Sequence, residues 1–190
     1  GDEYLQYPSS CGRAVPPLTD INIIDENWNT LKEGEVGEVV IKSPGNMVGY
    51  WKNPEATAEV FNDDGWFKSG DLGYFDGPFL HIVDRVKDLV IRGGENISCI
   101  EVEAAIYEHS DVLEACIIGI PDERLGELVA SAVHLKPGVE LSQDDIQEFL
   151  AGKIAAFKIP YEVRFFKDPL PKIASGKFDK PSLRKIFAND

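Results

Sequence analysis

The feature that most constrains the fold is a change of pattern within residues 84–103, Asp-Arg-Val-Lys-Asp-Leu-Val-Ile-Arg-Gly-Gly-Glu-Asn-Ile-Ser-Cys-Ile-Glu-Val-Glu. A charged segment leads into an apolar triplet at 89–91, which ends just before Gly93-Gly94. Ser98, followed three residues later by Glu101, has the spacing of a helix capping box. Adjacent glycines admit positive φ and let a backbone or a ligand approach closely. The stretch therefore predicts a strand, a flexible turn and a helix, which either serve only the fold or form a hinge beside a site.

Before this stretch the sequence is typical of β structure. Segments 20–25 and 37–42 are rich in β-branched residues, and residues 27–34 between them have the Asn, Lys and Gly of a hairpin loop. A further hairpin at 74–83 leads into the stretch. We therefore expect residues 1–84 to form a small β-barrel-like subdomain of short strands.

Beyond the stretch, helical and strand patterns alternate. Strands are expected at 112–120, 127–135 and 161–166, and helices at 99–109, after Ser142 and from Pro181. Residues 85–190 should therefore form a separate α+β domain, with helices packed on a three-stranded sheet.

Composition excludes several classes of protein. Hydrophobic residues make up 43% of the 190, enough for a core. Apolar runs such as 115–120 fall far short of the roughly 18 to 20 residues that cross a bilayer. The three cysteines are odd in number and form no Cys-x-x-Cys pair, which favours reduced thiols in a cytoplasmic protein. The histidines are equally scattered, and no metal-ligand spacing is present.

Charge is unevenly distributed along the chain. The net charge of −14 argues against general nucleic-acid binding. From Lys153 onward nine basic residues face four acidic ones, a balance of +5, so the residues before it carry −19. A basic C-terminal part could meet a small phosphorylated ligand, or it could simply be a solvated face.

Two side chains stand out as candidates for chemistry. Asp71 lies between glycines after two aromatic residues, where a carboxylate either holds a turn or accepts a hydrogen bond from a ligand hydroxyl. Lys177 follows Ser-Gly on a proline-bounded loop. Such a lysine is either solvated or a mobile charge that can neutralise phosphate or carboxylate oxygens.

Several motifs occur together in a characteristic order. They are Gly37-Glu-Val-Val-Ile with Gly49-Tyr-Trp-Lys-Asn-Pro54, Gly65-Trp-Phe-Lys-Ser-Gly-Asp71, Asp84-Arg-Val-Lys87 with Gly93-Gly-Glu-Asn-Ile97, Phe157-Lys-Ile-Pro160 and Ser175-Gly-Lys177. From about residue 12 to residue 187 the chain resembles the adenylate-forming superfamily, which comprises AMP-forming acyl- and aryl-CoA synthetases, firefly-type luciferases and nonribosomal adenylation domains.

The resemblance implies a role for each candidate in the first half-reaction. Asp71 would accept hydrogen bonds from the ribose hydroxyls of ATP or AMP, with Arg85 beside it. Lys177 would be the catalytic lysine that reaches the carboxylate and the α-phosphate during adenylation. Lys87 occupies the hinge position, about which residues 85–190 would rotate as a mobile lid. Mg²⁺ would be bound mainly through ATP and through a region that this sequence lacks.

The resemblance also implies a CoA path for the second half-reaction. Gly93 and Gly94 would line the pantetheine tunnel, Phe157 would stack on the CoA adenine, and Lys158 would face its phosphates. Ile159 and Tyr161 stand where relatives carry further basic residues, a departure from the pattern.

The superfamily's glycine-, serine- and threonine-rich phosphate loop, with its lysine, is not present in the sequence. The chain is therefore interpreted as the C-terminal part of an acyl-CoA synthetase acting on a fatty or aryl acid with ATP and CoA, inactive by itself, with a homodimer allowed for the full-length form. Two alternatives stay open: a non-catalytic module that binds nucleotide or protein, and a stand-alone adenylation enzyme that loads a carrier protein.

Overall fold

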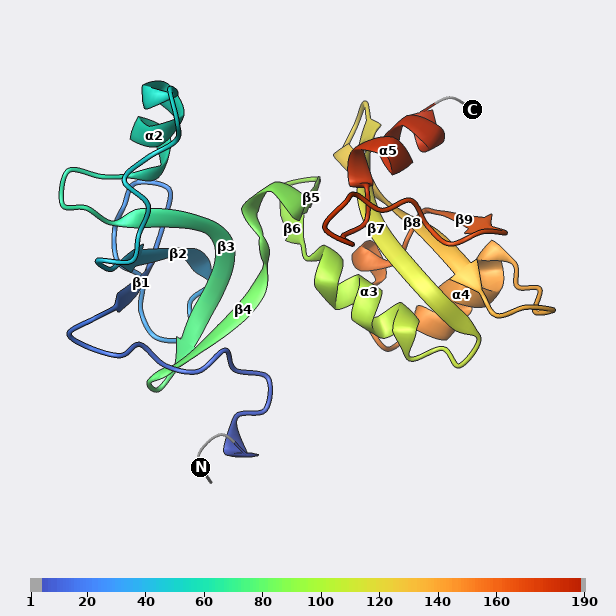
Figure 1. Ribbon diagram of the computed structural model, residues 1–190. Coiled ribbons are helices and arrows are strands. Elements are labelled where there is room, and N and C mark those ends of the chain that lie inside the picture. Colours follow the sequence, from blue (N-terminus) through green and yellow to red (C-terminus); the bar gives the residue numbers. More distant parts are fainter. Residues whose placement is uncertain (1–4, 189–190) are drawn as a thin grey trace. The chain divides into compact units, whose positions relative to one another are not determined.

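The computed structural model describes residues 5–188, and the chain divides into two compact units, Gly1–Lys87 and Asp88–Asp190 (Figure 1). The sequence placed this boundary after Asp84, whereas the structure places it after Lys87. Arg85 consequently belongs to the first unit, and Lys87 is the last residue before the second.

The first unit is built on an open, fully antiparallel sheet in the order β1-β2-β3-β4. The strands are β1 (Asp20–Ile24), β2 (Gly37–Lys42), β3 (Phe67–Asp76) and β4 (Phe79–Arg85). A barrel-like closure was expected, and that expectation is wrong. At Leu80 the outer edge of β4 is already paired with another segment, because the Leu80 carbonyl accepts the Cys11 N–H and the Leu80 N–H donates to the Gly12 carbonyl.

Packing in the first unit is modest. Its cluster of buried side chains consists of Ile23, Val39 and Leu80, with partly buried neighbours around it. Helix α2 (Pro54–Val60) begins at Asn53, whose side chain accepts a hydrogen bond from the Ala56 N–H, and it buries none of its residues. The sheet, rather than a central core, therefore determines where side chains of this unit point.

The second unit has a five-stranded sheet, in which β8 is the central strand. Its strands are β5 (Val90–Arg92), β6 (Glu95–Ile97), β7 (Val112–Asp122), β8 (Gly126–Leu135) and β9 (Glu162–Phe166). Strand β8 pairs antiparallel with β7 and β5 and parallel with β9.

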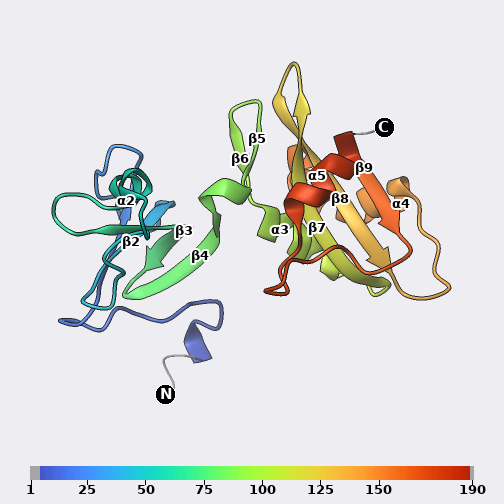
Figure 2. The ribbon, with the colours of Figure 1, turned by 45° about the horizontal axis from the view of Figure 1, so that its top comes forward.

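The sequence predicted a three-stranded sheet, which corresponds to β7, β8 and β9. The structure adds β5 and β6 to that sheet. After Gly93-Gly94 the chain does not enter the helix directly. Residues 95–97 first pair back on β5, with Val90 opposite Ile97. This short hairpin leads straight into α3 and extends the sheet at the start of β8 (Figure 2).

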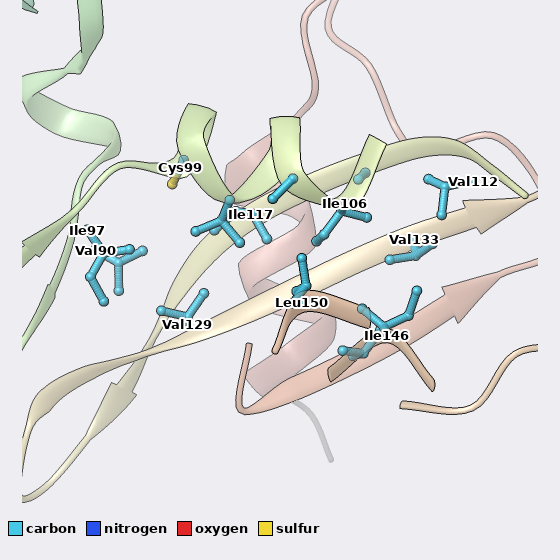
Figure 3. Packing of buried hydrophobic residues seen from close by; sticks show 14 residues of the cluster. Val90, Ile97, Cys99, Ile106, Val112, Ile117, Val129, Val133, Ile146 and Leu150 are labelled. Atoms are coloured by element: carbon cyan, nitrogen blue, oxygen red, sulfur yellow. The ribbon is translucent and has the colours of Figure 1, made fainter. Parts of the chain in front are cut away.

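Helices cover both faces of this sheet. The 3-10 helices are η1 (Val86–Asp88), just before β5, and η2 (Ala156–Lys158). Successive residues of β7 face opposite sides, so Ile117 packs with α3 (Cys99–Tyr107) and α4 (Gln143–Leu150), while Ile118 packs with α5 (Lys180–Ala188). Figure 3 shows the first of these clusters, with Ile106, Ile146 and Leu150 against the strands. The α+β fold class is confirmed.

The helix starts follow local chemistry. The Ser98 hydroxyl accepts a hydrogen bond from the Glu101 N–H, which confirms the predicted start of α3. Ser142 and Asp145 form a complete capping box at α4. These caps satisfy backbone N–H groups that would otherwise lack partners in the first helical turn.

Candidate functional site

Asp71 and Arg85 lie side by side on neighbouring strands of the first unit. They are Cα partners in the β3–β4 register, and the Arg85 Nε donates a hydrogen bond of 3.0 Å to Asp71 Oδ1. The side chains are 35% exposed for Asp71 and 53% for Arg85. The sequence suggested that these two residues act together, and the structure brings them into direct contact.

A serine that sequence reasoning missed holds Asp71 in place. The Ser69 hydroxyl accepts a hydrogen bond from the Asp71 N–H at 3.1 Å and donates one to the Val39 carbonyl at 2.8 Å. Gly70 between them has φ +77, which favours glycine. The signal in the sequence is a serine two residues before the aspartate, a spacing typical of hydroxyl-stabilised turns.

Part of the hydrogen-bonding capacity of the Asp71–Arg85 pair remains unused. Within residues 5–188 the structure shows no hydrogen bond to Asp71 Oδ2 or from the two terminal amino groups of Arg85. A carboxylate oxygen can accept hydrogen bonds from hydroxyls, and guanidinium N–H groups can donate to phosphate. The pair therefore offers an acceptor and a donor at one half-exposed position.

The strand end beneath Arg85 is also fixed by hydrogen bonding. Asp84 is 1% exposed, and its carboxylate accepts a hydrogen bond from the Arg85 N–H at 2.7 Å. The β3–β4 register shifts between Leu72 and Gly73, close to this carboxylate. A Cβ at Gly73 would lie 2.5 Å from the His81 carbonyl, so the close approach of the strands requires glycine there.

Gly93 and Gly94 form the turn of the β5–β6 hairpin, with φ of +61 and +88. The Gly93 N–H donates to the Leu125 carbonyl at 2.7 Å, which holds the turn against the loop between β7 and β8. No atom lies within 4 Å of a Cβ placed at Gly94. The turn is thus held by its backbone. It leaves open space at Gly94, whereas a Cβ at Gly93 would lie 3.3 Å from the Leu125 side chain.

Phe157 and Lys158 lie together in η2 on the second unit. The Lys158 amine donates to both carboxylate oxygens of Glu101 at 2.7 Å, and it lies 5.8 Å from the centre of the Phe157 ring. Glu101 is in the first turn of α3. Any anion that binds Lys158 must therefore compete with this carboxylate, a partner 57 residues away that sequence reasoning did not anticipate.

Lys177 is presented on a closed turn. The Ile173 N–H donates to the Lys177 carbonyl and the Gly176 N–H to the Ile173 carbonyl, both at 2.9 Å, while Lys172 pairs with Phe178 at the base. The side chain of Lys177 is exposed, and in the described part of the chain no ion pair reaches its amine. The Lys177 amine is therefore presented to solvent from a hydrogen-bonded turn, where it is accessible to a ligand.

The candidate residues are distributed over both units. Asp71 and Arg85 belong to the first, whereas Gly93, Gly94, Phe157, Lys158 and Lys177 belong to the second. Lys87, the expected hinge, is exposed in η1 at the unit boundary. In residues 5–188 no group of three or more His, Cys, Asp or Glu residues could hold a metal ion, and none of the described helices could cross a membrane.

Comparison with known proteins gives consistent matches. Residues 101–177 match the AMP-binding enzyme C-terminal domain, and residues 1–51 match the AMP-binding enzyme family. The chain is 41% identical over 171 residues to a feruloyl-CoA synthase of Amycolatopsis sp., covering 90% of this chain and 34% of that protein. It is 42% identical over 187 residues to the oxalate–CoA ligase of Arabidopsis thaliana, covering 98% and 36%.

A solved structure agrees with these relatives. The o-succinylbenzoate CoA synthetase MenE from Bacillus subtilis, in complex with the acyl-adenylate intermediate OSB-AMP, has a TM-score of 0.87 at 31% identity, over 96% of this chain and 37% of that one. The chain spans about a third of the length of the curated relatives that it matches. Two family matches in succession along the chain, close relatives and a common fold lead to one conclusion: this chain belongs to the family of AMP-binding, adenylate-forming enzymes.

Proposed function

We propose that these residues act in an ATP-dependent, AMP-forming acyl-CoA synthetase. In its first half-reaction a carboxylic acid and ATP would give acyl-adenylate and diphosphate, and in the second CoA would displace AMP to give the thioester. The observation that carries this proposal is the contact between Asp71 and Arg85, whose remaining acceptor and donor groups suit a nucleotide. The relatives named above are CoA ligases, which supports the same assignment.

The nucleotide would bind at the Asp71–Arg85 pair. Asp71 Oδ2 would accept hydrogen bonds from ribose hydroxyls, and hydrogen bonds to a charged group contribute about 1.5–3 kcal/mol each. Arg85 holds Asp71 in a fixed orientation through its Nε and would leave its terminal amino groups for the nucleotide. Ser69 contributes indirectly, because it fixes the backbone at position 71.

Lys177 would be the catalytic residue of adenylation. Negative charge increases on the α-phosphate as the carboxylate attacks, and a positioned cation stabilises that charge more than it stabilises the ground state. The exposed amine on a closed turn suits this role. Mg²⁺ would accompany ATP, held by its phosphates and by residues other than those described here, where no metal-binding cluster occurs.

The second half-reaction requires Lys177 to withdraw and CoA to enter. We propose that the second unit is a mobile lid, that Lys87 absorbs the backbone rotation, and that Gly93 and Gly94 then line the path of the pantetheine arm. Phe157 would stack on the CoA adenine. Lys158 would exchange Glu101 for a CoA phosphate, so CoA binding should loosen the N-terminal turn of α3.

The acid is not set by these residues. The names of the relatives differ in this respect, since one activates ferulate and another oxalate. We propose a fatty or aryl acid as substrate, no nucleic-acid partner, a cytoplasmic location and, for the assembled enzyme, a homodimer as the state to test. The location rests on Cys11, Cys99 and Cys116, which are all free thiols.

Two alternatives give different results in one assay. The whole polypeptide that carries these residues is incubated with ATP, Mg²⁺ and a panel of fatty, aryl and dicarboxylic acids, with CoA or with a phosphopantetheinylated carrier protein. Acid-dependent AMP release that requires CoA, with an acyl-CoA product, is expected. Thioester on the carrier protein alone indicates a carrier-loading enzyme. Nucleotide binding without AMP release indicates a non-catalytic module and refutes the proposal.

The 190 residues by themselves should release no diphosphate. The sequence contains no glycine-, serine- and threonine-rich phosphate loop, so the phosphates would lack much of their binding site. Diphosphate release is measured with the purified chain at high ATP and acid concentrations. Sustained release would show that a complete active site lies within these residues.

A further inference from the structure

The turn that carries Lys177 is attached to the second unit at two places. The first attachment is Glu114 on β7, which accepts hydrogen bonds from the Lys172 amine at 2.6 Å and from the Leu170 N–H at 2.7 Å. It lies on the N-terminal side of the turn. The second attachment is Lys180, three residues after Lys177 and the first residue of α5.

Lys180 is a lysine that the proposed chemistry does not use, and its environment is unusual. Its side chain is only 16% exposed, and its amine lies 3.7 Å from Asp88 Oδ1 and 3.9 Å from Glu103 Oε1. Burial alone lowers the pKa of a lysine, but Cys99, Glu103 and Asp88 more than offset this effect and raise the pKa of Lys180. The amine therefore stays charged between its two acidic partners.

Both partners of Lys180 are themselves held by other elements. The Glu103 carboxylate accepts the Ile117 N–H of β7 at 2.8 Å. The Asp88 carbonyl accepts a hydrogen bond from the Cys99 thiol at 2.7 Å. Asp88 directly follows Lys87 and ends η1. One mostly buried cation thus connects the segment beside the expected hinge, the helix α3 and the end of the Lys177 turn.

We propose that Lys180 is a positioning residue that couples the segment at the unit boundary to the turn carrying Lys177. Through its ion pair with Asp88, a backbone rotation at Lys87 would carry the Lys177 turn along as part of one rigid body. The proposal rests on the adenylation role proposed for Lys177. This coupling differs from a purely structural role of Lys180. A substitution at Asp88 should alter the stability of the Lys177 turn, although Asp88 itself need not form a hydrogen bond with that turn.

Amide hydrogen exchange of the 190-residue chain tests the coupling without any activity. The amides of Ile173, Gly176 and Asp179 report on the turn, since each donates one of its backbone hydrogen bonds. Lys180→Met should raise their exchange about tenfold, the scale of breaking a mostly buried ion pair. Asp88→Asn, changed at the other end of the pair, should raise exchange at the same amides.

A matched control removes another acidic partner of a lysine in the same unit. Glu108 pairs with Lys153 at the surface, and within residues 5–188 neither residue forms a hydrogen bond or ion pair with the Lys177 turn. Glu108→Gln should therefore leave the exchange rates of the three amides unchanged. If Lys180→Met does not fold, Asp88→Asn alone decides the question. The coupling is overturned if Asp88→Asn leaves exchange in the turn at the wild-type rate.

Kinetics of the whole polypeptide give the second test. Lys180→Met should lower kcat for adenylation about tenfold, with KM for ATP and thioester formation from preformed acyl-adenylate nearly unchanged. Lys180→Arg should restore part of the loss. The double variant Lys180→Met/Asp88→Asn should catalyse adenylation no more slowly than either single variant, because both substitutions remove the same coupling. Equal loss in both half-reactions, together with a lower Tm, would mean a structural role and would overturn the proposal.

The two failures can be told apart. If the wild-type polypeptide activates no acid, the proposed function fails, and the exchange measurement still decides whether Lys180 couples the two segments. If acids are activated but Lys180→Met leaves adenylation and the exchange of the turn unchanged, the function stands and the coupling is wrong.

Discussion

The two units differ in how their side chains are packed. The described part of the second unit holds two clusters of 14 and 7 buried residues, one on each face of its sheet. From residue 5 onward the first unit has one cluster of three, and it exposes Val48 completely and Trp51 to 88%. A sheet covered on both faces by helices should behave as a rigid body, whereas the first unit relies on its strand pairing.

This difference matches the roles proposed for the two units. The Asp71–Arg85 pair needs only two adjacent strands in register, and the first unit provides them. The catalytic role proposed for Lys177 would need a body that moves without deforming, and the segments flanking the Lys177 turn pack into the second cluster through Leu170 and Phe178. A well-packed body has few intermediate shapes, which suits movement between discrete positions.

The largest expected effect comes from breaking the core of the second unit. Leu150 is fully buried, so Leu150→Ala should destabilise this unit by about 2–5 kcal/mol. The sequence has three tryptophans, Trp28, Trp51 and Trp66, all of them in the first unit. In urea unfolding, far-UV circular dichroism should shift to lower denaturant while the tryptophan fluorescence transition stays in place.

The matched variant is Val48→Ala, which removes a fully exposed side chain of the first unit. It should change neither transition by more than about 0.5 kcal/mol. If Leu150→Ala moves the tryptophan transition as far as the dichroism transition, the two units unfold together and the contrast between them is wrong.

The next effect concerns nucleotide binding by the first unit. Asp71→Asn keeps the shape of the side chain but removes the charge that Arg85 and a ribose hydroxyl would share, so KM for ATP should rise by an order of magnitude or more, about 1.5–3 kcal/mol. Asp76→Asn is the control, because Asp76 is exposed at the C-terminal end of the same strand. Equal KM values for both variants would remove Asp71 from the nucleotide site.

A smaller effect is expected at the β5–β6 hairpin, which lies at one edge of the second unit's sheet. The Glu127 carboxylate accepts the Ile91 N–H at 2.8 Å and helps to hold β5, which has one paired position on β8. Glu127→Ala should raise amide exchange at Ile91 by about tenfold, on the scale of one hydrogen bond. Glu127→Gln keeps an acceptor oxygen and should exchange nearly as wild type. Unchanged exchange in Glu127→Ala would show that this bond does not hold the hairpin.

The smallest effect is a pH dependence at the Glu114 attachment of the Lys177 turn. Burial opposes ionisation of Glu114, but hydrogen bonds from Lys172 and the Leu170 N–H outweigh it and lower the pKa of the carboxyl below its ordinary value of 4.5. A lowered folded-state pKa gives stability that is present above 4.5 and lost as the pH falls through the folded-state value.

The difference in Tm between the wild type and Glu114→Gln should therefore be constant above pH 4.5 and should shrink below it. A difference that grows toward acid pH would reverse the sign of the effect.

The cysteines offer a simple check of the packing around Cys116 in the second cluster. Burial, with a further contribution from Glu103, raises the pKa of the Cys116 thiol to about 12. This thiol should therefore stay unmodified under conditions in which a thiol reagent modifies the exposed Cys11.

Local features were predictable from the sequence because their causes are local. Ser98 begins α3 through a hydrogen bond to a backbone N–H three residues away, which spacing alone reveals. The order of helices and strands in the second unit followed from runs of apolar residues in the same way. Asp71 and Lys177 were identifiable as candidates from the residues around them.

Features that depend on distant pairing were not predictable. The open sheet of the first unit follows from Cys11 and Gly12 occupying the edge of β4, about 70 residues along the chain. Strand β6 has three residues, too few for a periodic pattern. The acidic partners of Lys158 and Lys180 were not foreseen either, because only the fold brings Glu101 to the first lysine and Asp88 to the second.

The central claim is that Lys177 acts in adenylation and leaves the site for the thioester step. The direct test is Lys177→Ala in the whole polypeptide, with each half-reaction measured separately and Lys167→Ala, another exposed lysine, as control. We predict that adenylation falls by roughly 100-fold or more, the scale of losing one positioned charge, while thioester formation from preformed acyl-adenylate keeps its rate. An equal loss in both half-reactions would contradict the account.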